Sequence, residues 1–185
     1  MEKEYWKAGN MLYPVPAVLV STGDMNDSNL FTVAWCGTVC TNPPMLYISV
    51  RPERYSYDLI IKNKEFVVNL TTKSLAYATD YSGVRSGRDV DKFEHLKLTK
   101  LKSKYVSSPS VMESPVNIEC KVEKIIPLGS HHMIIASVLG VSIDKSLLDE
   151  KGKFDLGKAD LIVYSHGEYF TLGDVIGKFG YSVKK

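Results

Sequence analysis

Short apolar runs rich in β-branched residues recur along the chain, and each is bounded by Gly, Pro, Asn or Asp. Runs of this length with turn residues at their ends predict β-strands. The predicted strands are residues 17–22, 32–39, 45–50, 65–70, 117–128, 131–143 and 160–173. Because many short strands must close or stack their sheets to bury an apolar face, the pattern predicts an antiparallel barrel or sandwich.

Helical patterns are fewer, which predicts a mainly β protein with peripheral helices. Residues 56–64 begin with Ser56 as a candidate N-cap, carry Asp58 early and gather lysines late, as a helix would. Residues 72–82 predict a second short helix, and the polar, glycine-containing stretch 83–95 predicts a surface loop. No G-x-G-x-x-G follows a predicted strand, so a Rossmann dinucleotide fold is not supported.

Size and composition predict one domain over residues 1–185 and exclude several function classes. The net charge is +2 with acids and bases mixed, which leaves no basic stripe for nucleic acid. No apolar run approaches the roughly 20 residues of a membrane span. The start, MEKEYWKAGN, lacks an apolar signal core, and three cysteines cannot all pair. We therefore expect a cytoplasmic protein in a reducing compartment.

Two cysteines, Cys36 and Cys40, raise the question of a thiol redox or metal site. In a strand, four residues span about 13 Å, which exceeds the roughly 7 Å Cα limit for a disulfide. A helix would bring the two thiols together, but the surrounding β-branched residues and Gly37 favour a strand. No further soft ligands lie at zinc-like spacing, so no metal site is predicted. Both cysteines are expected to be buried or half-buried wall residues.

The segment SVRPERYSYDLI, residues 49–60, predicts a strand end, a turn and the start of a helix. The free N–H groups of a helix N-terminus, with the guanidinium of Arg51 or Arg54 and the hydroxyl of Ser56, would form an anion site. A solvated turn with a routine cap is the alternative, and these residues alone leave both open.

Two other segments carry candidate polar groups. Gly83 permits close backbone approach, and Lys92 could supply another cation or simply lie on the surface beside a packed phenylalanine. His131 and His132 are neighbours in a predicted strand, so they face opposite sides and cannot bind one metal together. At most one of them faces a pocket and titrates near neutrality. No local signature of a Ser-His-Asp triad is present.

Taken in order, these segments resemble the flavin reductase-like family with the FMN-binding split-barrel fold, which includes flavoredoxins. The resemblance extends from residues 13–22 to residues 161–173. Its most specific parts are residues 29–35, 42–60, 65–70, 82–93, 113–120 and 129–138. It implies an antiparallel split β-barrel.

The resemblance also implies which residues hold the cofactor. The backbone of Thr32, Val33, Ala34 and Trp35 would lie beside the isoalloxazine ring, and Ser49, Val50 and Arg51 along the ribityl chain. Arg54, Tyr55 and Ser56 match the phosphate-binding turn, and Ser82, Gly83 and Lys92 match a further cofactor-contacting loop. The family's usual Gly-Asp-His stands here as Gly129-Ser130-His131. The missing aspartate leaves His131 as an assisting catalytic residue at most.

The function implied by the resemblance is that of an FMN-binding flavin reductase that transfers hydride from NAD(P)H to flavin. The implied assembly is a homodimer with FMN near the interface, passing electrons to a protein or oxygenase partner. A flavoredoxin-like electron carrier reduced by a protein donor is the alternative. A barrel that binds no flavin is the third, and it predicts a colourless protein.

Overall fold

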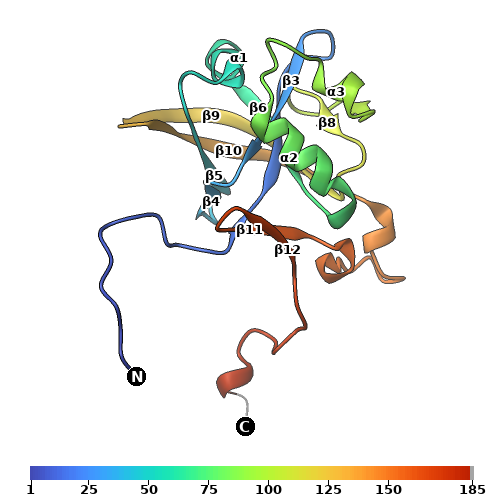
Figure 1. Ribbon diagram of the computed structural model, residues 1–185. Helices are drawn as coiled ribbons and strands as arrows, with labels where there is room; N and C mark the ends of the chain where they lie inside the picture. The colour runs from blue at the N-terminus through green and yellow to red at the C-terminus, as the bar shows by residue number, and fades with distance from the viewer. Residues whose placement is uncertain (184–185) are drawn as a thin grey trace.

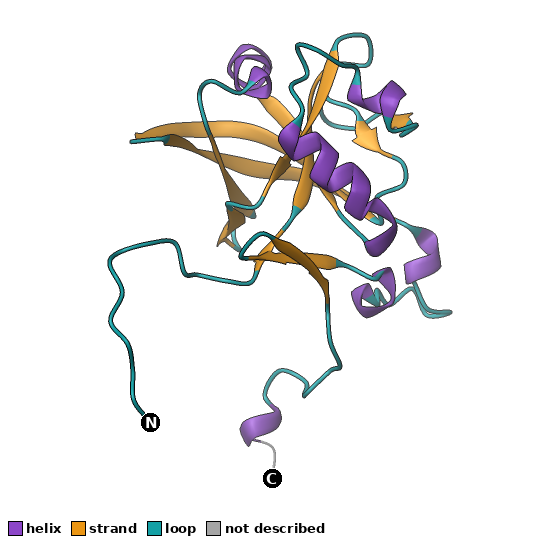
Figure 2. Ribbon diagram, in the orientation of Figure 1, coloured by secondary structure: helices purple, strands orange, loops and turns teal. Residues whose placement is uncertain are grey.

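The computed structural model describes residues 1–183 and consists mainly of antiparallel β-sheet (Figures 1 and 2). Its largest sheet has seven strands in the order β3-β2-β6-β9-β10-β5-β4. These are β2 (Val18–Gly23), β3 (Ser28–Val33), β4 (Cys36–Cys40), β5 (Met45–Val50), β6 (Glu65–Leu70), β9 (Val116–Leu128) and β10 (His131–Ile143). Two small sheets add β1 (Val15–Pro16) with β11 (Ile162–Ser165) and β12 (Glu168–Thr171), and β7 (Lys100–Leu101) with β8 (Ser110–Val111). The mainly β prediction is confirmed.

Three α-helices lie at the margin of the large sheet: α1 (Tyr55–Asn63), α2 (Ala76–Val84) and α3 (Lys92–His95). Short 3₁₀ turns are η1 (Lys73–Leu75), η2 (Lys145–Leu147), η3 (Leu156–Ala159) and η4 (Tyr181–Val183). The loop predicted over residues 83–95 was wrong at both ends, because α2 continues to Val84 and α3 begins at Lys92. The Asp91 carboxylate caps α3 by accepting a hydrogen bond from Glu94 N at 3.2 Å.

The main core lies inside the curved large sheet. Phe66, Ile48 and Ile134 are fully buried there, and β5 alternates buried and half-buried residues as a strand with one face inward should. A second cluster on the other side of β2 and β3 contains Leu19, Leu30, Ala78, Phe93 and Val111. This second cluster holds α2 and α3 against the back of β3, and so fixes the walls of the cleft described below.

The strand predicted over residues 32–39 is in fact two strands. β3 ends at Val33, the chain turns at Ala34 and Trp35, and β4 begins at Cys36. The carbonyl oxygen of Trp35 accepts a hydrogen bond from Ser49 N at 2.8 Å, which ties this turn to the end of β5. Because β3 and β4 form opposite edges of the sheet, the turn lies where the barrel is split.

The run predicted as one strand over residues 160–173 is a hairpin. β11 and β12 pair antiparallel around a turn in which His166 and Gly167 have φ of +49° and +89°. Gly167 adopts such a φ without steric cost, which explains the reversal at that point. The hairpin lies beside β1 and below α2 in Figure 1.

Candidate functional site

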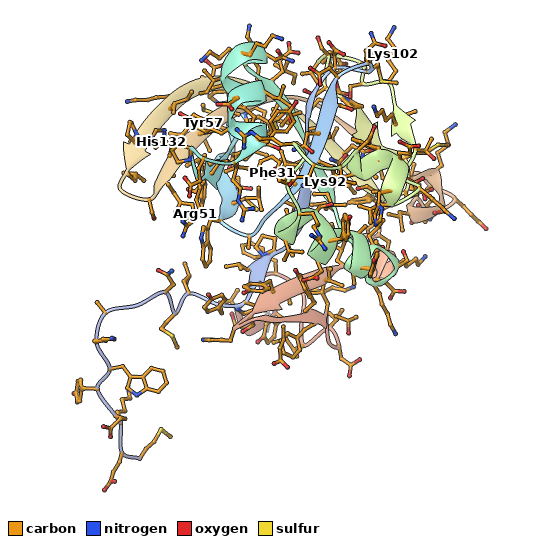
Figure 3. All side chains as sticks on the ribbon, turned by 45° about the horizontal axis from the view of Figure 1, so that its top comes forward. Phe31, Arg51, Tyr57, Lys92, Lys102 and His132 are labelled. Carbon is orange, nitrogen blue, oxygen red and sulfur yellow. The ribbon has the colours of Figure 1, made fainter. Side chains whose placement is uncertain are left out.

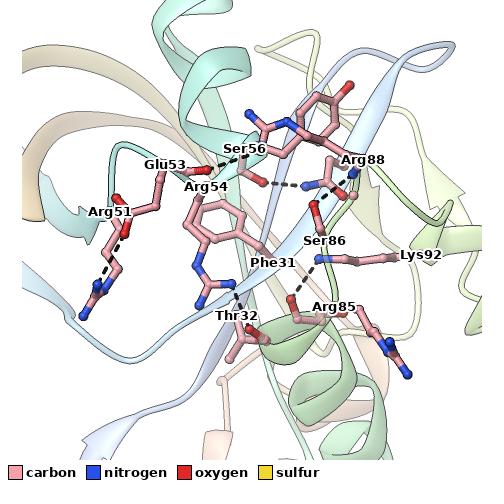
Figure 4. A pocket seen from close by; sticks show the side chains of 15 residues that line it. Phe31, Thr32, Arg51, Glu53, Arg54, Ser56, Arg85, Ser86, Arg88 and Lys92 are labelled. Carbon is pink, nitrogen blue, oxygen red and sulfur yellow. Dashed lines mark hydrogen bonds and ion pairs between the residues drawn. The ribbon is translucent and has the colours of Figure 1, made fainter.

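A polar cleft lies between β3, the turn before α1, and the segment joining α2 to α3 (Figure 4). Its wider part has a volume of about 420 Å³. A narrower part of about 150 Å³ continues along Phe31–Trp35 toward the end of β5. The linings of the two parts share Phe31, Thr32, Arg51 and Arg54, so the two parts adjoin one another.

Every residue that the family resemblance assigned to the cofactor site, and His131, lines one of these two parts. The wider part contains Thr32, Arg51, Arg54, Tyr55, Ser56, Ser82, Gly83 and Lys92. The narrower part contains Thr32, Val33, Ala34, Trp35, Ser49, Val50, Arg51, Arg54 and His131. The chain segments that carry them are far apart in sequence and meet only in the fold. That these residues bind a flavin stays a prediction.

Arginines dominate the rim of the wider part. Arg54 donates from Nη1 to the carbonyl oxygen of Gly83 at 3.2 Å, which joins the turn before α1 to the end of α2. Arg51 pairs with Glu53 at 3.3 Å, and this carboxylate is exposed. Arg88 reaches Asp58 at 3.1 Å and lies 5.3 Å from the centre of the Tyr55 ring. Two of these arginines are therefore paired with carboxylates, and Arg54 binds a backbone carbonyl oxygen instead.

Lys92 is the buried cation of the site. Its side chain is only 3% exposed, and Nζ donates to the carbonyl oxygens of Leu30 at 2.7 Å and Ser82 at 2.9 Å. Among the described residues, no carboxylate lies within ion-pair distance of it. Burial, with a smaller contribution from Arg54, lowers the pKa of Lys92 to about 8. An ammonium bonded only to neutral oxygens leaves room for an anion as its third partner.

Two further features belong to the wall of the wider part of the cleft. The Ser82 hydroxyl is buried in the cleft wall and has no hydrogen-bond partner among the described residues. A Cβ added at Gly87 would come within 2.2 Å of the Asn29 amide oxygen, so the chain passes too close for a side chain there. In Figure 3, Phe31 and Lys92 lie close together near the centre of the molecule.

The predicted helix cap at Ser56 was wrong. Arg54 occupies the N-cap position and α1 begins at Tyr55. The Ser56 side chain is buried and its oxygen accepts a hydrogen bond from Asn29 Nδ2 at 2.7 Å. Ser56 still lines the cleft, but its hydroxyl is held by β3 rather than by its own helix.

The two adjacent histidines face opposite sides, as predicted. His132 Nδ1 lies 2.7 Å from the Tyr57 hydroxyl, away from the cleft. His131 lines the narrower part, with Ser130 Oγ 2.9 Å from its Nδ1. Partial burial and the nearby Arg51 lower the pKa of His131. His131 therefore favours its neutral form beside the cleft, and a serine stands where a carboxylate would have raised its basicity.

Sequence reasoning missed part of the lining: Asn29, Phe31, Glu53, Arg85, Ser86, Gly87 and Arg88. The signal for four of them was present in the run RSGR at residues 85–88, where two arginines flank a small, glycine-containing turn. That run lay in a segment predicted to be a solvated loop. In Figure 4 the Arg85 guanidinium points away from the other labelled side chains.

Cys36 and Cys40 are free and half-buried in β4, and Cys120 is free and buried. The prediction that Cys36 and Cys40 are half-buried is confirmed, but neither residue lines either part of the cleft. Burial raises the pKa of Cys36 to about 12, so this thiol stays protonated and unreactive at neutral pH. Among residues 1–183, no group of three or more His, Cys, Asp or Glu side chains could hold a metal ion.

We predict that replacing both strand cysteines leaves the site unchanged. A Cys36→Ala and Cys40→Ala double variant should bind FMN within about threefold of the original chain, because neither thiol lines the cleft. Flavin fluorescence quenching would measure the affinity, and the thermal unfolding midpoint would report any cost of the lost packing. A flavin affinity tenfold weaker in a folded double variant would contradict this prediction.

Comparison with known proteins supports the fold and places the chain among relatives. Residues 10–173 match the family described as "Flavin reductase like domain". An uncharacterized protein of Archaeoglobus fulgidus is 32% identical over 160 residues, covering 86% of this chain and 89% of that protein. The solved structure of flavoredoxin of Desulfovibrio vulgaris (Miyazaki F) superposes with a TM-score of 0.91 at 31% identity, covering 99% of this chain and 100% of that one. Flavoredoxin from Methanosarcina acetivorans gives 0.89 at 26% identity, covering 98% and 97%.

The family match covers most of the chain, and the two flavoredoxin structures share its split-barrel architecture over nearly their full length. The chain therefore belongs to the flavin reductase-like family.

Proposed function

We propose that this protein binds FMN in the cleft and acts as a flavin reductase that transfers hydride from NAD(P)H to flavin. The observation that supports it most directly is Lys92, a buried ammonium beside an unpartnered buried hydroxyl in a cleft rich in arginine. A buried cation without a carboxylate is costly unless an anion joins it. A terminal phosphate would supply that anion.

The residues present fit the phosphate end of FMN. Arg54 and Lys92 approach the wider part of the cleft from opposite walls, and Ser82 and Ser86 add hydroxyl donors. Charge-assisted hydrogen bonds of this kind are about twice as strong as neutral ones. In this proposal Arg54 and Lys92 bind the phosphate, and Arg88 holds the Tyr55 side of the wall in place.

The narrower part of the cleft fits the flat ring system. It follows Thr32–Trp35 from the end of β3 into the turn before β4. Because β3 is an edge strand of the described sheet, the backbone groups on its outer side have no neighbouring strand to pair with. Backbone groups fixed in this way orient a ring edge without side-chain reorganisation. A bound flavin would supply the two-electron chemistry. The chain's own residues bind and orient it, and His131 is an assisting residue at most.

A flavoredoxin-like electron carrier is the second candidate function. It is favoured by the flavoredoxin structures, which superpose over nearly the whole chain at 31% and 26% identity. In this alternative the same cleft holds FMN, and a protein donor replaces the nicotinamide.

Stopped-flow absorbance separates the two functions. The FMN-loaded protein is mixed anaerobically with NADH or NADPH, and loss of the flavin absorbance band is followed. Rapid bleaching by either nucleotide is the expected result. No bleaching with either, together with rapid reduction by a ferredoxin-like donor, would reject the reductase in favour of the carrier. A purified protein that binds no added FMN would reject both.

We further propose a homodimer with the flavin sites near its interface, located in the cytoplasm and passing electrons to a protein or oxygenase partner. None of the described helices is long and apolar enough to cross a membrane. The assignment of residues 1–185 to one domain also stays a prediction.

A further inference from the structure

A second cavity, of about 360 Å³, lies between α2, the end of β3 and the β11–β12 hairpin. Figure 1 shows that hairpin passing below α2. Three aromatic side chains line this aromatic cavity, Trp35, Tyr164 and Tyr169, together with the carboxylate of Asp80; the rest of the lining is Thr32 and small or aliphatic residues. Its volume falls within the range of about 300–1,000 Å³ that small-molecule sites occupy.

The aromatic walls are held in place by neighbouring rings. The ring centroids of Tyr164 and Tyr169 lie 5.6 Å apart. The ring of Tyr13, which is not part of the lining, lies 6.0 Å from that of Trp35 and 6.1 Å from that of Tyr164. Aromatic pairs at these separations attract one another. Walls that are fixed before a ligand enters cost little conformational entropy on binding.

Asp80 is the only charged residue in the lining of the aromatic cavity, as far as the structure describes the chain. Its Oδ1 accepts a hydrogen bond from the Tyr169 hydroxyl at 3.3 Å. Burial, and after it the nearby Asp80, raise the pKa of Tyr169 to about 12, so this hydroxyl keeps its proton at neutral pH. No Lys, Arg or His side chain among residues 1–183 forms an ion pair with Asp80. The cavity therefore presents a carboxylate that lacks a cationic partner within the described chain.

The neighbouring cleft has the opposite charge. The lining of its wider part holds several cationic side chains, and Glu53 is the one carboxylate among the described lining residues. The aromatic cavity adjoins both parts of the cleft, because it shares Thr32 with each of them and Ala34 and Trp35 with the narrower part. The two spaces therefore favour different ligands, an anion in the cleft and a cation in the aromatic cavity.

Aromatic faces beside a carboxylate suit an organic cation. A cation over a ring is attracted by the quadrupole of that ring, most strongly at Trp, and the attraction grows as water is excluded. A neutral ligand of the same shape would pack on the rings but would gain little from the carboxylate. An anion of that shape would be repelled by it.

We propose that the aromatic cavity binds a small organic cation, an aromatic amidine or a substituted ammonium compound, beside the ring end of the candidate flavin site. Asp80 supplies the opposite charge, and Trp35, Tyr164 and Tyr169 supply the ring faces. Because Trp35 also lines the narrower part of the cleft, a ligand held here occupies the position of a second substrate. The site goes beyond the proposed binding of FMN and does not require it.

The test is a ligand-observed NMR titration of the full chain with benzamidine, without and with FMN. Benzamidine is a planar aromatic cation, and benzamide has nearly the same shape without the charge. Asp80→Asn removes the carboxylate from an exposed position of α2, and Tyr164→Leu removes one ring face. Glu168→Gln is the matched control, because Glu168 is exposed, precedes Tyr169 in β12 and so faces the other side of the hairpin, outside the lining.

The original chain should bind benzamidine at least about fivefold more tightly than benzamide, both without and with FMN. Asp80→Asn should weaken benzamidine binding at least about fivefold, and Tyr164→Leu roughly 2- to 30-fold. Glu168→Gln should change it less than about twofold, because an exposed charge is screened.

Three results would overturn the proposal: equal affinity for benzamidine and benzamide, benzamidine binding that survives Asp80→Asn, or displacement of benzamidine by FMN, which would place it in the cleft. Failure of the original chain to bind benzamidine would overturn it as well. Because the titration is also carried out without flavin, a chain that binds no FMN would remove the proposed function and leave this test intact.

Discussion

Replacing Arg54 with Ala should weaken FMN binding by about 1.5–3 kcal/mol, which is roughly 10- to 150-fold in the dissociation constant. The guanidinium lies at the junction of the two parts of the cleft and already bridges to Gly83 at 3.2 Å. Its loss would remove a charge-assisted contact to the phosphate and would also release the end of α2 from the turn before α1. Fluorescence quenching titration of apoprotein with FMN measures the effect.

Riboflavin and a second variant make this test specific. Riboflavin lacks the phosphate, so its affinity should change little in the Arg54→Ala protein. Lys62→Ala removes the same unit charge from the opposite end of α1, outside the cleft, and should change FMN affinity less than about threefold. Equal losses for FMN and riboflavin would place Arg54 in a structural role, and unchanged FMN affinity would show that the phosphate lies elsewhere.

Replacing Lys92 with Met should also weaken FMN binding and should change its pH dependence. Met keeps much of the length and apolar volume of the lysine, but it removes a buried cation that meets no described carboxylate. Loss of one partner of a buried, hydrogen-bonded charge pair costs at least about 2 kcal/mol, so FMN should bind at least about 30-fold more weakly. Isothermal titration calorimetry at pH 7 measures the loss.

The sign of the pH dependence follows from the lowered pKa of about 8. A phosphate beside Lys92 favours its charged form, so the complex binds more protons than the free protein above pH 8. FMN affinity should therefore be level just below pH 8 and fall by up to tenfold for each further pH unit. Lys92→Met should abolish this alkaline decline.

Stability of the free protein provides an internal control, because it should change in the opposite direction. The pKa of Lys92 lies below its ordinary value of 10.5, so between about pH 8 and 10.5 the unfolded chain binds more protons than the folded one. The contribution of Lys92 to the free energy of unfolding should consequently rise with pH over that window. An affinity that declines only where the protein also unfolds would contradict the proposed role.

Four segments show how much of the strand pattern can be predicted from the sequence alone. The runs at residues 45–50 and 65–70 became β5 and β6 with their predicted bounds, because alternating or continuous apolar residues between turn residues have few other stable arrangements. The segments at 32–39 and 160–173 were predicted as single strands and are each interrupted. In the first, the turn depends on contacts with distant residues, such as the bond between the Trp35 carbonyl and Ser49 N.

The environment of individual side chains was harder to predict from the sequence than the strands were. Lys92 was an ordinary candidate for a surface cation, and only the packing of α3 against β3 buries it. Ser56 was a natural helix cap, yet Asn29, distant in sequence, holds its hydroxyl. Arg85 to Arg88 were assigned to a solvated loop, although α2 and α3 direct that loop over the cleft.

The sequence by itself determined the mainly β architecture, the order of its strands along the chain, and the residue types that surround the cleft. Local propensity and the spacing of apolar residues carry that information, because they act within a few positions of the chain. The tertiary structure alone decided where the barrel splits, which cationic side chains are buried, and that both termini extend away from the large sheet. Burial and charge balance are sums over residues far apart in sequence, and folding is what brings those residues together.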